Sequence, residues 1–306
     1  MGTMRFDRDK GELDYGVIGE KFGNLLTAIS NLLEREPRYQ HVNSAPILFV
    51  QLFRNAINTY RTVFYIIADS PKDPLRDPKF SLSLPPLTRK LYEQLMMFFF
   101  LLEDVPAMVP YIFKTGYTER RREMDHAMKY HRTDPDWKPY MDQLQHLIDG
   151  LETGYKVTAK EKKDPVQFIG RGPTPGGLIK LLKNNRPKAT CIDFMEYIQS
   201  WIYRELSGQA HLSIVEVVET GFFFLREDAE ARFGRTWEKE VEERLEQYRQ
   251  NQLITAITLL LAIATEVDVH FKYNHTEKLK FVWTVLNEHS DMTKDFWDRR
   301  YSALLL

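Results

Sequence analysis

The chain has 306 residues, of which 43% are hydrophobic and 13% aromatic, and its formal net charge is −1. This composition can bury a substantial core, and the balanced charge excludes a global attraction to nucleic acid or to an anionic membrane, so any basic surface must be local. The single cysteine, Cys191, excludes an intrachain disulfide and a thiolate cluster for zinc or iron–sulfur.

The first residues, MGTMRFDRDKGELD, are charged and lack an apolar stretch, so we expect no secretory signal and a cytoplasmic location. Apolar residues then recur at intervals of three and four, which predicts helices over 14–35 and 44–69. The prolines between the second helix and Pro86 predict a connector without regular structure. The next helix begins after Pro85 and Pro86 and carries the apolar run LMMFFFLL, so we expect it at the centre of the fold.

The rest of the chain also has helical periodicity. We expect further helices over 106–131, 135–154, 190–207, 210–225 and 236–270, and a pair over 275–303. The segment 158–177 is charged and then rich in glycine and proline, which predicts a long loop or a flexible joint. The apolar runs at 95–102 and 253–264 are shorter than the roughly 18–20 residues of a membrane span. The sequence therefore predicts an all-α, multi-helix bundle of eight to ten helices in one domain, 1–306, without a membrane segment.

Polar residues form a row on the predicted helix 190–207 and the segment that follows it. At 100° per residue they fall on one side of the helix, while large apolar residues occupy the flanking positions. The members of this row are Glu196, Ser200, Tyr203, Ser207 and His211.

Two other apolar helices carry similar rows. Arg89 and Glu93 are four residues apart on the most apolar helix, and Arg54, Asn58 and Arg61 interrupt the helix 44–69. A buried polar group without a partner costs about 1–3 kcal/mol, so we expect the three rows to meet near the centre of the molecule. They form either a hydrogen-bond network that fixes the packing or the lining of a pocket. In the second case Arg89, Glu93, Arg54 and Asn58 are the candidate substrate-binding residues.

The stretch YRELSGQAHLS, residues 203–213, combines Arg204 and His211 with a Tyr-x-x-Leu-Ser-x-x-x-His-x-Ser pattern. The arginine–histidine spacing resembles the R-x(4–6)-H motif of the HEPN superfamily of helical domains. Together with Arg89-x-x-x-Glu93, the longer pattern is similar to an uncharacterised helical family found mostly in bacteria. The HEPN-like core would cover roughly residues 44–270.

This resemblance implies a metal-independent ribonuclease without a cofactor, in a bacterial defence or toxin system. His211 would move the proton of the RNA 2′-hydroxyl and Arg204 would stabilise charge on the phosphate, with Tyr203 and Ser207 beside them. The family implies a homodimer in which two subunits pair their motifs. Glu205 departs from the pattern, because it puts an acid where phosphate would approach. The alternative is a non-catalytic helical protein that binds a partner or a small ligand.

Other candidate sites are less specific. The R-x(4–6)-H spacing also occurs at Arg35/His41 and twice before His126, so spacing alone does not identify a site. The basic and aromatic stretch 117–132 predicts either a phosphate-binding patch or a solvated helix face laced by ion pairs. It includes Glu123 and His126 at a Glu-x-x-His spacing, but no second such pair accompanies them, so we expect no metal. The glycine-rich loop 170–183 predicts a joint or an anion site.

Overall fold

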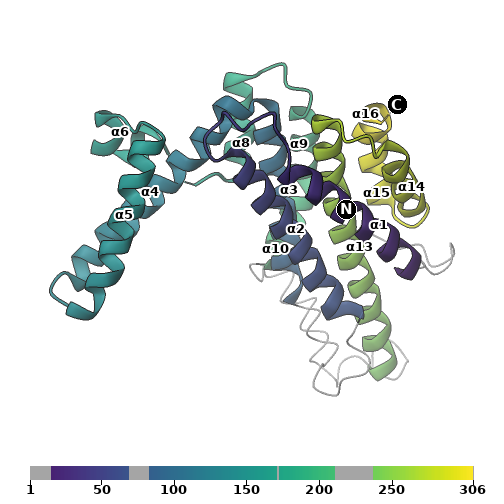
Figure 1. Ribbon diagram of the computed structural model, residues 1–306. Coiled ribbons are helices and arrows are strands. Elements are labelled where there is room, and N and C mark those ends of the chain that lie inside the picture. Colours follow the sequence, from purple (N-terminus) through teal and green to yellow (C-terminus); the bar gives the residue numbers. More distant parts are fainter. Residues whose placement is uncertain (1–14, 69–82, 171, 211–236, 306) are drawn as a thin grey trace.

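The computed structural model describes residues 15–68, 83–170, 172–210 and 237–305 (Figure 1). These residues form helices and no β-strand, which confirms the all-α, multi-helix prediction. Several helices are short, so the described residues hold more segments than the eight to ten expected. The elements are α1 (Tyr15–Glu34), α2 (Ala45–Ala68), α3 (Pro85–Glu103), α4 (Val105–His131), η4 (Pro135–Trp137), α5 (Lys138–Gly154), α6 (Ala159–Lys163), α7 (Pro165–Phe168), α8 (Pro175–Asn185), α9 (Ile192–Ile198), η5 (Gln199–Tyr203), α10 (Arg204–Ala210), α13 (Trp237–Phe271), α14 (Thr276–Asn287), α15 (Asp291–Phe296), η6 (Trp297–Tyr301) and α16 (Ser302–Leu304).

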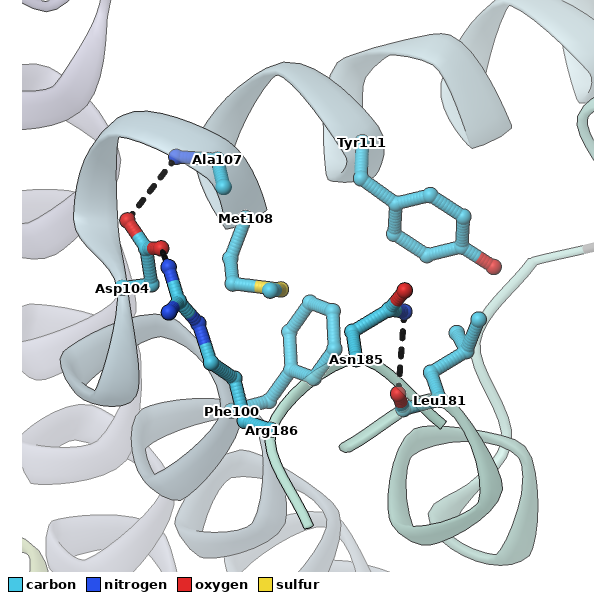
Figure 2. A pocket seen from close by; sticks show the side chains of 8 residues that line it. All are labelled: Phe100, Asp104, Ala107, Met108, Tyr111, Leu181, Asn185 and Arg186. Atoms are coloured by element: carbon cyan, nitrogen blue, oxygen red, sulfur yellow. Dashed lines mark hydrogen bonds and ion pairs between the residues drawn. The ribbon is translucent and has the colours of Figure 1, made fainter. Parts of the chain in front are cut away.

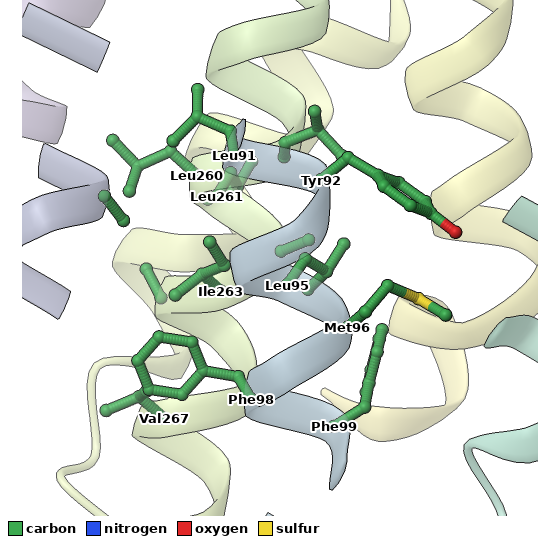
Figure 3. Close-up of a cluster of buried hydrophobic side chains, with 14 of the residues drawn as sticks. Leu91, Tyr92, Leu95, Met96, Phe98, Phe99, Leu260, Leu261, Ile263 and Val267 are labelled. Atoms are coloured by element: carbon green, nitrogen blue, oxygen red, sulfur yellow. The ribbon is translucent and has the colours of Figure 1, made fainter. Parts of the chain in front are cut away.

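Helix α3 lies at the centre of the main core, as its apolar run predicts. It begins with Pro85, whose missing N–H has no helical partner in any case, and it packs against α2, α10 and α13. Figure 3 shows α3 beside α13, with Leu91, Leu95 and Phe98 close to the α13 side chains. These α3 side chains are fully buried, so this contact organises the fold.

Helix α13 contains a segment, Leu245–Phe271, that is long and apolar enough to cross a membrane by length and composition. The apolar run 253–264 alone understates that length. In the structure, however, 89% of the apolar window is buried against other helices. A central helix of a folded core passes the same test, and among the described residues no other helix does.

Helices α4 and α5 form an arm that projects away from the main body (Figure 1). The first part of α4 packs on the main core through Val105 and Val109. Further along, Tyr117 and Met124 join Leu144 and other residues of the arm in a separate hydrophobic cluster. The described residues therefore form two hydrophobic clusters, and α4 runs from one into the other.

The predicted loop at 158–177 contains two short helices, α6 and α7. Thr158 and Glu161 form a capping box in which each side chain accepts a hydrogen bond from the backbone N–H of the other residue. Lys114 of α4 binds Glu161 with Nζ–Oε1 2.8 Å. These contacts fix the start of the segment to the arm.

The C-terminal helices are pinned to α13 by a buried ion pair. Arg300 donates from Nε to Oε1 of Glu266 at 2.6 Å and from Nη2 to Oε2 at 2.8 Å. Trp283 stacks on Tyr301 and donates to Thr265 of α13 at 3.1 Å. The pair and the stacked rings thus hold α14–η6 against the main core.

Candidate functional site

The candidate site lies where α3 packs against η5 and α10. Arg89 of α3 donates from Nε to Oε1 of Glu93 at 3.0 Å and from Nη2 to the hydroxyl of Tyr203 at 3.2 Å. The guanidinium carbon of Arg89 also lies 5.2 Å from the centroid of the Tyr203 ring. The structure therefore brings together three residues from two of the predicted rows.

Glu93 is more open to solvent than the apolar sequence around it indicates. Its side chain is 43% exposed, whereas that of Arg89 is 20% exposed. The carboxylate of Glu93 is therefore not sealed inside the apolar core. The pair lies at the edge of the core, where solvent reaches the carboxylate.

Tyr92 is a site residue that none of the predicted rows includes. Its ring centroid is 5.3 Å from that of Tyr203, and its side chain is fully buried. Burial raises the pKa of the Tyr92 hydroxyl, and the neighbouring Tyr203 and Glu93 raise that pKa further. Tyr92 therefore remains a neutral phenol that supports the Tyr203 ring. It could have been found from the sequence, since it lies three residues after Arg89.

The polar row predicted on helix 190–207 is not continuous. A π-helical turn, η5, separates α9 from α10, and this extra-wide turn rotates the residues after it relative to those before it. Glu196 faces solvent and binds Lys183 of α8 with Oε1–Nζ 2.6 Å, while Ser200 is exposed and donates to the carbonyl of Tyr197. Among the described members of the row, Tyr203 is the one that contacts α3, through Arg89 and Tyr92.

The four predicted catalytic residues are placed as follows. Tyr203, at the end of η5, and Ser207, in α10, are half-buried and four residues apart, and Leu206 between them is buried. The side chain of Arg204 is exposed. His211 and Ser213 lie outside the described residues. The Arg204–His211 relationship thus stays a prediction, whereas Arg204 itself is accessible.

The row on α2 does not belong to this site. Arg54 is 51% exposed and pairs with Glu34 of α1, and Asn58 and Arg61 are also exposed. The expectation that this row meets the other two at the centre is wrong. Apolar residues that are exposed on α2, such as Ile47 at 66%, hide its solvated face in the sequence.

A buried polar contact beside the site was not predicted. Thr88, next to Arg89, donates to Oε1 of Gln252 on α13 at 2.8 Å, and both side chains are buried. The contact ties the start of α3 to the long helix behind it. It joins residues 164 positions apart, and periodicity along one helix cannot reveal such a partner.

The weaker motifs have structural partners. Glu123 binds Arg120 and Tyr140, as expected for a solvated face laced by ion pairs. In the loop before α8, Thr174 accepts the N–H of Gly177 at 3.2 Å, and the carboxylate of Glu119 lies against Gly172. An acid at this loop opposes a bound anion. In the part of the chain that the structure describes, no group of three His, Cys, Asp or Glu side chains could hold a metal ion.

No family model matches the chain, and no curated protein or solved structure matches it either.

Proposed function

We propose that the protein is a HEPN-like, RNA-binding enzyme that cleaves RNA without a metal or cofactor at the α3–α10 surface. The observation that carries the proposal is the exposed side chain of Arg204, one residue after a tyrosine that Arg89 holds against α3. An exposed arginine on an anchored helix can bind phosphate bidentately, because its guanidinium has a fixed fork of N–H donors.

In this reaction the 2′-hydroxyl of RNA attacks the adjacent phosphorus and the 5′-oxygen leaves. His211 takes the proton from the 2′-hydroxyl. Protonated His211 then gives a proton to the leaving oxygen. Arg204 stabilises the negative charge that builds on the phosphate oxygens. In an α-helix, residues seven positions apart lie nearly two turns apart on the same side. We propose that Arg204 and His211 act on the substrate from one side in this way.

Arg89, Glu93 and Tyr203 serve a different purpose in this proposal. Their mutual contacts fix the position of α10 on α3, and the guanidinium of Arg89 neutralises the half-exposed carboxylate of Glu93 at the edge of this surface. The resemblance to HEPN proteins adds a homodimer that pairs two motifs and a role in bacterial defence or toxicity, and the proposed location is the cytoplasm.

The test is cleavage of total RNA in the presence of EDTA by the wild-type protein, Arg204→Ala and His211→Ala. We expect both substitutions to lower cleavage by about 100-fold or more, since one charge-stabilising or proton-transferring group contributes about that much. The pair Arg35 and His41 supplies matched controls, because both are exposed and share the motif spacing. Arg35→Ala and His41→Ala should cleave as the wild type does. Equal activity of all five proteins would contradict the proposal.

A second function has its own support. Arg89 already engages Glu93 and Tyr203, so the same cluster can serve packing in a non-catalytic helical protein that binds a partner or a small ligand. In that case the wild-type protein does not cleave RNA, and the role of His211 is to pack against Tyr203, Glu93 or an arginine.

A further inference from the structure

A cavity of about 290 Å³ lies at the far end of α3 from Arg89, where α3, α4 and α8 meet. Its volume is just below the range of about 300–1,000 Å³ that is typical of small-molecule sites, so it fits a small ligand. Figure 2 shows its lining: Phe100, Asp104, Ala107, Met108, Tyr111, Leu181, Asn185 and Arg186.

The cavity has an apolar, aromatic wall. Phe100 and Met108 are buried at its base, and Leu181 of α8 lines another side. The rings of Phe100 and Tyr111 are 5.7 Å apart with an interplanar angle of 59°. Aromatic faces and a thioether favour a flat, polarizable ring over a branched aliphatic group.

The charges at the cavity are matched to each other. Asp104 pairs with Arg186 and also accepts the backbone N–H of Ala107 at 3.3 Å. The carboxylate and the guanidinium neutralise each other, so this part of the lining has no net charge that would attract an anionic or a cationic ligand. The site therefore favours a neutral ligand.

One amide completes the recognition. Asn185 donates from Nδ2 to the carbonyl of Leu181 at 2.9 Å, which uses one of its two N–H groups. Its second N–H and its Oδ1 remain as an adjacent donor and acceptor in one plane. Figure 2 shows this amide between the Tyr111 ring and the Met108 side chain. A carboxamide presents the complementary acceptor and donor.

We propose that this cavity binds a neutral aromatic carboxamide, with its ring on the Phe100, Met108 and Leu181 wall and its amide paired with Asn185. This binding is separate from RNA cleavage, because the cavity and Arg89 lie at opposite ends of α3.

The test compares benzamide, benzoate and benzamidine, three ligands of nearly the same shape that are neutral, anionic and cationic, by ligand-observed NMR titration at neutral pH. We expect benzamide to bind at least tenfold more tightly than either charged analogue. Asn185→Ala should weaken benzamide about fivefold to 100-fold, the effect of two lost hydrogen bonds. The control Asn184→Ala alters an exposed neighbour outside the lining and should leave the affinity unchanged.

A second variant tests the place of binding. Ala107 is exposed at the mouth, so Ala107→Phe adds a ring there without altering a buried position, and it should abolish benzamide binding at unchanged melting temperature. The proposal is overturned if benzoate or benzamidine binds as tightly as benzamide, if none of the three binds at millimolar concentration, or if Ala107→Phe binds benzamide normally. RNA cleavage by Ala107→Phe should equal that of the wild type.

Discussion

Arg89 holds Tyr203 in two ways, with a hydrogen bond of 3.2 Å from its Nη2 to the tyrosine hydroxyl and a guanidinium that lies 5.2 Å from the ring centroid. This contact joins the central helix α3 to the end of η5, directly before the helix that carries Arg204. The contact fixes the position of the backbone next to Arg204, and the first prediction concerns its loss.

We expect Arg89→Ala to lower the free energy of unfolding by about 1–2 kcal/mol, the combined effect of a lost hydrogen bond and a partly screened ion pair. A sealed pair would cost about 3–5 kcal/mol when broken, but Glu93 is 43% exposed and water solvates it. Tyr203→Phe removes the hydroxyl and keeps the ring, so it should cost about 0.5–1.5 kcal/mol. Urea denaturation measures both, with the exposed Lys90→Ala as the control. A loss of 4 kcal/mol in Arg89→Ala would mean that Glu93 is stranded without water.

The ion pair of Arg300 and Glu266 is more deeply buried than that of Arg89 and Glu93. Its side chains are only 11% and 9% exposed. The charge of Glu266 and its hydrogen bonds raise the pKa of Arg300 despite the opposing effect of burial. Arg300→Ala leaves Glu266 buried and unpaired, so we expect a loss of about 3–5 kcal/mol. Arg299→Ala removes an exposed arginine that stacks on Tyr197 and should cost less than about 1 kcal/mol. Equal losses in the two variants would show that the Arg300 pair adds nothing beyond a surface contact.

The stability of the protein should fall as the solution is acidified below pH 6.5, and His270 should account for part of this loss. Burial lowers the pKa of His270 from its usual 6.5, the charge of Arg38 lowers it further, and Glu36 opposes the shift. The unfolded chain therefore binds this proton first, so its contribution is constant above the unfolded pKa and is lost as pH falls toward the folded pKa.

We expect His270→Gln to lose less stability than the wild type between pH 7.5 and pH 5.5 in urea denaturation. Part of the local packing remains in this variant. Arg38 donates from Nη1 to the backbone carbonyl of residue 270 at 2.8 Å, and the substitution leaves that carbonyl in place. The exposed His146 of α5 provides the control variant His146→Gln, which should follow the wild-type curve. A His270→Gln protein with the wild-type pH dependence would contradict the assignment.

The sequence predicts the all-α, multi-helix fold because apolar residues recur at intervals of three and four along the core helices. The start of α3 at Pro85 and the central place of its LMMFFFLL run both follow from local chemistry. The pairing of Arg89 with Glu93 follows as well, since residues four apart are neighbours on a helix.

Other parts of the site depend on tertiary structure. The sequence has no pattern that predicts the π-helical turn Gln199–Tyr203. A polar row projected at 100° per residue along 190–207 therefore wrongly included Glu196 and Ser200. The row on α2 failed for another reason, because the exposed apolar side chain of Ile47 made a solvated face resemble a buried one. The partner of Thr88 could not be predicted either, since Gln252 approaches it from a distant helix.

The most direct measurement of the proposed function is single-turnover cleavage of an end-labelled, single-stranded RNA in EDTA, beside the same strand with 2′-O-methyl groups. The proposal predicts that the wild-type protein cuts only the RNA with free 2′-hydroxyls and leaves 2′,3′-cyclic phosphate ends. It also predicts that Arg204→Ala cuts about 100-fold more slowly, while Arg35→Ala matches the wild type. Cleavage of the 2′-O-methyl strand, or an Arg204→Ala protein as fast as the wild type, would contradict it.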